Sequence, residues 1–195
     1  MKAWQHFKTV NRHRFLVMKL CFRLGLYRQG LTHDLSKYSP TEFRIGAKYY
    51  AGTRSPNALE REQAGYSTAW MHHKGRNRHH YEYWTDLDPK TKQYVPVAMP
   101  RRYLAEMFAD RVAACMVYHG ESYRDDDALK YFQSCGDRPL MHPDTARQLV
   151  YLLQLLADSG EETAFAFVRD VVLTGKPFAE AEPEETACKN GGGVV

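Results

Sequence analysis

The sequence predicts an all-α protein, a single bundle of roughly six to seven helices over residues 1–175. Apolar residues recur at steps of three and four residues along most of the chain, which is the period of one face of a helix. Proline and glycine mark the expected helix boundaries. The length of 195 residues suits one domain, and no segment of 20 to 50 residues repeats, so a solenoid is not expected.

The first helix is predicted up to Gly25, which would end it. Its apolar stripe runs at alternating steps of four and three residues through His6, Val10, His13, Val17, Leu20 and Leu24. A second helix is predicted from Ser39 as N-cap, with Pro40 in the first turn and the Glu42 carboxylate closing a capping box. That helix should run to about Ala51.

A third helix is expected from the segment RSPN (54–57) to a break near Gly75, and it carries YSTAWMHH (66–73). Residues 85–100 predict a loop, with a short extended piece at QYVPV (93–97).

The next predicted helix begins at Pro100 and ends at Gly120. A short helix should follow through ALKYF, capped by Asp127 or a neighbour, and then two helices joined at Gly160. Residues 176–195 are acidic, rich in glycine and without periodicity, and we expect a disordered tail there.

The composition is that of a soluble globular protein, with 44% hydrophobic and 26% charged residues. No apolar run approaches the ~20 residues of a membrane helix. The charged N-terminus lacks a signal-peptide core, so a cytoplasmic location and no membrane partner are expected. The cysteines form no CxxC pair and are expected to fill space as reduced side chains; they are Cys21, Cys115, Cys135 and Cys188.

The net charge of +4 conceals an asymmetry along the chain. Residues 1–111 hold 20 Lys and Arg against 9 Asp and Glu, whereas residues 112–195 hold 7 against 14. A basic first half suits anionic ligands such as phosphates, nucleotides or nucleic acid. The alternative is a set of scattered, solvated side chains.

Polar residues interrupt the predicted apolar stripes at three places. His13 lies between Val10 and Val17, Asp110 shares a face with apolar neighbours, and His33-Asp34 is enclosed by leucines. A buried carboxylate is unfavourable unless it is paired or binds a metal. His13 alone is read more readily as a core histidine, and Asp110 has Arg111 or Arg102 as possible partners. Together, however, these residues suggest a metal site inside the bundle.

A histidine cluster, HHKGRNRHH (72–80), offers further metal ligands. On one uninterrupted helix, His73 and His80 share a face with Asn77, whereas His72 and His79 share another. We expect His73 and His80 to point inward, although a break at Gly75 would bring in His72 or His79. The alternative is an exposed basic turn. Neighbouring aromatic residues would shield the site from water, namely Trp70, Tyr81, Tyr83 and Trp84.

The order H…HD…H…HH…D resembles the HD-domain superfamily of helical metal-dependent phosphohydrolases, and HDLSK resembles its HDIGK variant. GLTHDLSKYSPTEF, AWMHHKGRNRHHYEYW and EMFADR also resemble a bacterial and phage family of unknown function over most of residues 4–175. The superfamily resemblance implies a first divalent metal, with Asp34 bridging to a second held by cluster histidines. The implied ligands are His13, His33, Asp34, His73, His80 and Asp110, with His72 and His79 as alternatives.

The resemblance and the residues together predict a metal-dependent phosphohydrolase of a small phosphate ester, a nucleotide in the first instance. One or two ions are expected, of Mn, Fe, Co, Ni, Zn or Mg. Expected catalytic residues are Asp34, Lys37 and Glu82, and expected substrate-binding residues are Lys37, Arg76, Asn77 and Arg78. The alternatives are an HD-like di-iron oxygenase and a non-enzymatic, metal-stabilised module that binds nucleic acid or a protein partner. The oligomeric state is left open.

Overall fold

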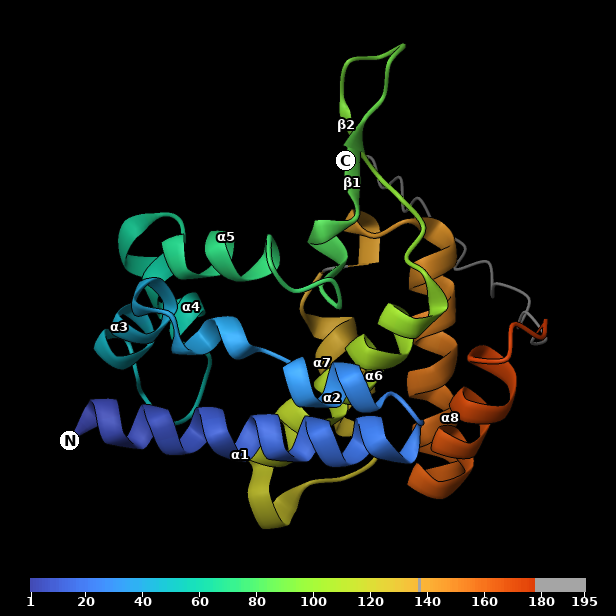
Figure 1. Ribbon diagram of the computed structural model, residues 1–195, viewed down its shortest axis with the longest axis horizontal. Helices are drawn as coiled ribbons and strands as arrows, with labels where there is room; N and C mark the ends of the chain where they lie inside the picture. The colour runs from blue at the N-terminus through green and yellow to red at the C-terminus, as the bar shows by residue number, and fades with distance from the viewer. Residues whose placement is uncertain (137, 178–195) are drawn as a thin grey trace, which may run out of the picture.

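The computed structural model describes residues 1–136 and 138–177, and these residues fold into eight α-helices and one small β-hairpin (Figure 1). The predicted all-α class is confirmed. The helices are α1 (Lys2–Arg23), α2 (Tyr27–Thr32), α3 (Pro40–Lys48), α4 (Pro56–Ala64), α5 (Thr68–Lys74), α6 (Arg101–His119), α7 (Asp127–Ser134) and α8 (Pro143–Phe167). The tail predicted over residues 176–195 lies, beyond residue 177, outside the described residues.

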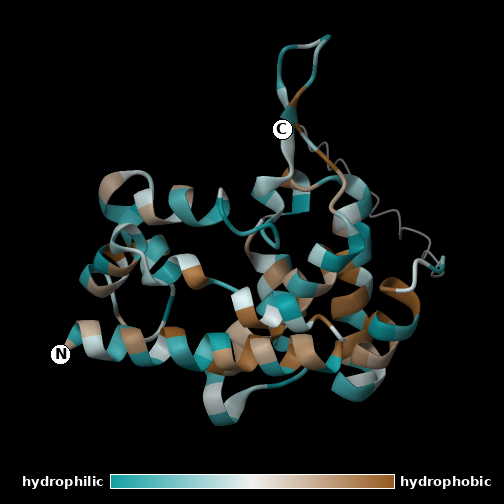
Figure 2. Cartoon of the chain, viewed as in Figure 1, coloured by the Kyte–Doolittle hydropathy of each residue, from teal (hydrophilic) through white to brown (hydrophobic). Residues whose placement is uncertain are grey.

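The hydrophobic core lies around α6, which packs against α1, α7 and α8. Leu104, Phe108 and Val112 of α6 are fully buried. The stripe predicted for α1 is confirmed, since all six of its residues are buried. Figure 2 shows hydrophobic residues gathered on α6 and α8 and mixed with hydrophilic ones along α1. Among the described helices, none combines the length and apolarity needed to cross a membrane.

The segment 56–74 forms two helices instead of the one predicted. Gly65 ends α4 with a positive φ of 80°, a conformation that glycine adopts without steric strain. Ser67 then caps α5 by accepting a hydrogen bond from the Trp70 N–H at 3.0 Å. The buried Glu60 of α4 accepts hydrogen bonds from Ser67 and Thr68, which fixes the corner between the helices.

A two-stranded antiparallel hairpin leaves the helical body after the histidine cluster (Figure 1). Its strands are β1 (Thr85–Leu87) and β2 (Tyr94–Pro96), paired in the register Thr85 to Pro96. The predicted extended piece at 93–97 is therefore confirmed. Tyr94 on this hairpin is 80% exposed.

Helices α1 and α3 approach closely at Gly46. A Cβ atom placed on Gly46 would lie 2.2 Å from His6 Nε2, so only glycine fits there. The buried His6 ring also contacts the rings of Phe43 and Tyr50, which limits its movement. This contact sets the distance between α1, which carries His13, and the segment around α3 that carries Glu42.

Candidate metal centre

The turn at His33-Asp34 places two ligand side chains in the same buried space. Asp34 has φ 54° and ψ 24°, the left-handed conformation that aspartate tolerates better than most residues. Arg14 holds the turn from α1, because its Nε–H donates to the His33 carbonyl at 2.7 Å and its Nη2 donates to the Leu31 carbonyl at 3.1 Å. His33 and Asp34 are only 2% and 1% exposed.

The first group of candidate ligands is His13 of α1, His33, Asp34 and Asp110 of α6, whose ligand atoms all lie within 4.8 Å of one another. His13 Nε2 is 3.0 Å from Asp110 Oδ1 and 3.7 Å from Asp34 Oδ2. His33 Nε2 is 3.5 Å from each of these two oxygen atoms. The structure thus brings together the four residues that the sequence suggested for a first metal.

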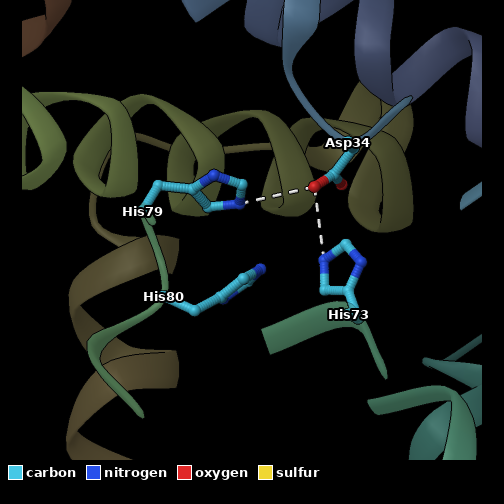
Figure 3. Close-up of side chains that lie close together, drawn as sticks. All are labelled: Asp34, His73, His79 and His80. Atoms are coloured by element: carbon cyan, nitrogen blue, oxygen red, sulfur yellow. Dashed lines mark ion pairs between the residues drawn. The ribbon is translucent and has the colours of Figure 1, made fainter. Parts of the chain in front are cut away.

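The second group is Asp34, His73, His79 and His80, drawn in Figure 3. His73 Nε2 and His79 Nε2 lie 3.2 and 3.4 Å from Asp34 Oδ1. Asp34 therefore faces the first group with Oδ2 and the second with Oδ1. One side chain is shared by the two groups, as a bridging ligand would be.

The faces assigned to the histidines on one continuous helix do not apply beyond Gly75, because α5 ends there. Because the chain turns there, His79 joins His73 and His80 around Asp34, although a continuous helix would have pointed it elsewhere. His72 belongs to neither group, and its Nδ1 lies 2.6 Å from Glu42 Oε1.

Five buried atoms at the centre make no hydrogen bond of suitable geometry, although some lie 3.0 to 3.5 Å from an oppositely charged group: His13 Nε2, His33 Nε2, His79 Nε2, His80 Nε2 and Asp34 Oδ1. Buried polar atoms normally have a hydrogen-bond partner, and each exception requires an explanation. All five are ligand atoms by chemistry, and all belong to the two groups. A divalent cation in each group would bind these atoms, so the residues fit a metal.

Two further carboxylates, of Glu106 and Glu42, contact the Nδ1 atoms of the histidine rings. Glu106 Oε1 lies 3.0 Å from His33 Nδ1 and 3.1 Å from His79 Nδ1. Burial raises the pKa of Glu106, but the two histidines outweigh it and bring the pKa to about 2. An ionised carboxylate only accepts hydrogen bonds, so each Nδ1 carries a proton, and loss of the second ring proton would leave each Nε2 able to bind a metal.

Glu42 holds the ring of His73 in the same way. Its Oε2 accepts a hydrogen bond from His73 Nδ1 at 2.7 Å. The capping box predicted for α3 is only half formed, because Ser39 accepts from the Glu42 backbone N–H at 3.3 Å while the Glu42 carboxylate faces the histidines. The expectation that this carboxylate caps the helix was wrong, since tertiary pairing with His72 and His73 replaces the local bond.

Charges in the centre shift the pKa values of its members. Burial raises the pKa of Asp34, yet His33, Lys37 and His73 together hold it well below its usual range. Burial lowers the pKa of His79, but Asp34 and Glu106 raise it to about 10. Lys37 Nζ lies 2.6 Å from Asp34 Oδ2, and this contact keeps the pKa of Lys37 above its usual value despite burial. Protons on these basic side chains balance the charge of the carboxylates, and a bound cation would displace protons from the histidines.

The remaining sequence-predicted residues lie around the centre. Glu82 accepts a hydrogen bond from Trp70 Nε1 at 3.2 Å. Asn77 is buried and donates to Ser36 Oγ at 2.8 Å and to the His73 carbonyl at 2.9 Å, so its contacts support the position of His73.

The two arginines of the cluster are exposed and contact other residues. Arg76 donates to the His72 carbonyl, and Arg78 donates to the Tyr103 hydroxyl. Trp70, whose ring centroid is 4.7 Å from that of His80, covers one side of the second group as predicted.

Glu106 was missed by the sequence reasoning. It precedes Asp110 by one helical turn, so both carboxylates lie on the same face of α6. A second buried acidic residue at that spacing could have signalled its role.

The fold and the centre define an all-α protein with buried histidine and carboxylate groups that could hold a metal ion. Residues 2–155 match a family described as "Family of unknown function (DUF5662)", and the chain belongs to that family. The predicted resemblance to a family of unknown function is confirmed to that extent, while the HD-domain resemblance stays a prediction. No curated protein and no solved structure matches the chain.

Proposed function

We propose that this protein is a metal-dependent phosphohydrolase with two adjacent metal sites that share Asp34. The observation that carries the proposal is the set of five buried ligand atoms without a hydrogen bond of suitable geometry. They belong to two groups that share the Asp34 carboxylate. The contacts of these atoms with the neighbouring carboxylates include several of 3.4 to 3.7 Å, and a metal ion would bind the same nitrogen and oxygen atoms directly.

The first site would be held by His13, His33, Asp34 and Asp110, and the second by Asp34, His73, His79 and His80. Imidazole nitrogen and carboxylate oxygen together suit Mn, Fe, Co, Ni or Zn better than Mg, which prefers oxygen ligands. Divalent cations in such sites act as Lewis acids toward phosphoryl oxygens and lower the pKa of water.

The chain's own residues leave one side of the centre accessible. The side chains of Lys37 and Asp110 are 30% and 16% exposed, whereas that of His33 is fully buried. Lys37 is fixed by its contact with Asp34 and stays protonated, so its ammonium group is suited to bind a phosphate oxygen at this side. The ring of Trp70 excludes water from the opposite side, beside His73 and His80.

The substrate class follows from charge. The basic first half of the chain contributes most of the residues around the centre and favours the approach of an anion. A small phosphate ester, and in particular a nucleotide, fits both this charge and the partly exposed side chains of Lys37 and Asp110.

Elemental analysis of the purified protein tests the proposal first. Wild type should carry up to two equivalents of a transition metal, and His33→Ala and Asp34→Ala should lose it. His119→Ala is a matched control, because His119 is an exposed histidine paired with Asp127 outside both groups.

Phosphate release from a panel of nucleotides and sugar phosphates should then depend on the metal found and be absent in both variants. Metal-free wild type whose thermal stability is unchanged by added Mn, Fe, Co, Ni or Zn would refute the proposal. Iron with substrate-dependent oxygen consumption, and no phosphate release, would favour the oxygenase.

A further inference from the structure

The outward face of α1 carries aromatic and basic side chains in one line. Trp4, Lys8, Phe15, Lys19 and Phe22 follow one another at steps of four, seven, four and three, so they lie along a single meridian of the helix. This line, which we name the α1 ridge, lies opposite the buried stripe that contains His13. Trp4 is 61%, Phe15 57% and Phe22 37% exposed.

The ridge extends onto α2. Phe22 contacts Tyr27 edge to face, with ring centroids 5.3 Å apart, and Tyr27 is itself 61% exposed. Leu31, one turn further along α2, is 58% exposed. A shallow groove of about 180 Å³ runs between the two helices and is lined by Asn11, Arg14, Phe15, Met18 and Gly30. Solitary exposed apolar residues are ordinary, but several exposed rings along one side of two adjacent helices are typical of an interaction surface.

The segment that carries the ridge has charges of one sign only. Residues 1–33 contain no Asp or Glu, and their cationic side chains are Lys2, Lys8, Arg12, Arg14, Lys19, Arg23 and Arg28. Arg23 is paired with Glu161 of α8 and Arg14 with backbone carbonyls, whereas Lys8 and Lys19 lie over the rings of Trp4 and Phe15 at 5.4 and 5.8 Å. The ridge is therefore complementary to a polyanion.

We infer that the α1 ridge binds single-stranded nucleic acid. Exposed rings serve as stacking platforms for bases, and the lysines between them meet the phosphates. An anionic membrane would require a continuous apolar sector with basic residues at its borders, but here Lys8 and Lys19 lie on the same line as the rings. Two copies of an acid-free face would repel each other, which disfavours a symmetric dimer through it.

This surface is independent of the metal centre, because the ridge and His13 are on opposite faces of α1. Fluorescence anisotropy of the full-length protein with labelled oligo(dT) and oligo(U) of about 20 nucleotides, longer than one typical binding site, tests the inference. We expect binding that weakens with salt, and each of Trp4→Ala and Phe15→Ala should reduce affinity about tenfold, which is the scale of one lost stacking platform. Lys8→Gln and Lys19→Gln should each reduce the slope of log K against log salt by about 0.7.

Matched controls come from the hairpin, where Tyr94→Ala and Lys92→Gln change a ring and a cation that are also exposed and should leave binding unchanged. Circular dichroism checks that each variant is folded. No binding at low salt, equal binding of polyglutamate, or equal loss with the hairpin variants would overturn the inference. It would also be overturned if the ridge variants lost binding to phosphatidylserine vesicles and not to oligonucleotides, or if they abolished a dimer.

Discussion

Replacing Glu106 by glutamine keeps the size of this buried side chain but changes the hydrogen bonds that it can accept from His33 and His79. In wild type one carboxylate oxygen faces the Nδ1–H groups of both His33 and His79, and Gln29 donates to the other oxygen at 2.8 Å. A neutral amide has a single acceptor oxygen and an NH₂ group, so the hold on both rings weakens. Loss of such a supporting carboxylate typically lowers metal affinity about 10- to 100-fold, or about 1.4 to 2.7 kcal/mol.

The distinctive expectation is that Glu106→Gln weakens both sites, because His33 belongs to the first group and His79 to the second. Glu42→Gln should weaken only the second, since Glu42 holds His73. Calorimetric titration of metal-free protein with Mn or Zn resolves the two affinities and the stoichiometry. If Glu106→Gln binds both ions as tightly as wild type while remaining folded, the assignment of Glu106 as a shared support is refuted.

Three other predictions concern α1 and the segments packed against it. Gly46→Ala should destabilise the fold by up to about 2 kcal/mol, because overpacking against His6 exceeds the gain in helix propensity; in a His6→Ala background the same change should become stabilising in urea denaturation. Burial, and secondarily Lys37, lowers the pKa of His6 to about 4. An unfolded histidine titrates near 6.5, so the stability contributed by burying neutral His6 is present above pH 6.5 and is lost as the pH falls toward 4. His6→Gln should therefore lose less stability than wild type over that range. Arg14→Ala should lower the unfolding free energy by about 2 kcal/mol, since charged donors to the turn at His33 disappear; the exposed neighbour Arg12→Ala should change it by less than about 0.5 kcal/mol.

Periodicity in the sequence predicted those parts of the structure that depend on one helix alone. The buried stripe of α1 and the bounds of α6 follow from local spacing, and so does the inward position of His13 and Asp110. Periodicity succeeds there because both helices are long and pack along their whole length.

The rest depends on contacts between segments. The choice between His79 and His72 is made where α5 ends at Gly75, and that end is stabilised by Asn77 and Ser36, a contact absent from any local pattern. Glu42 had two possible partners, a helix N-terminus and the histidines, and only the packing of α3 on α5 decides between them. The splitting of 56–74 into two helices, in contrast, has local signals in Gly65 and Ser67, which the prediction of one helix overlooked.

The order of the ligands along the chain has a consequence for biosynthesis. His13, His33 and Asp34 leave the ribosome early, whereas Glu106 and Asp110 arrive only with α6. A nascent chain that ends before α6 has neither Asp110 of the first group nor the Glu106 carboxylate that holds His33 and His79. In the proposed metal centre the first site is therefore complete only after more than half of the protein has been translated, and fragments truncated before α6 should bind metal there more weakly.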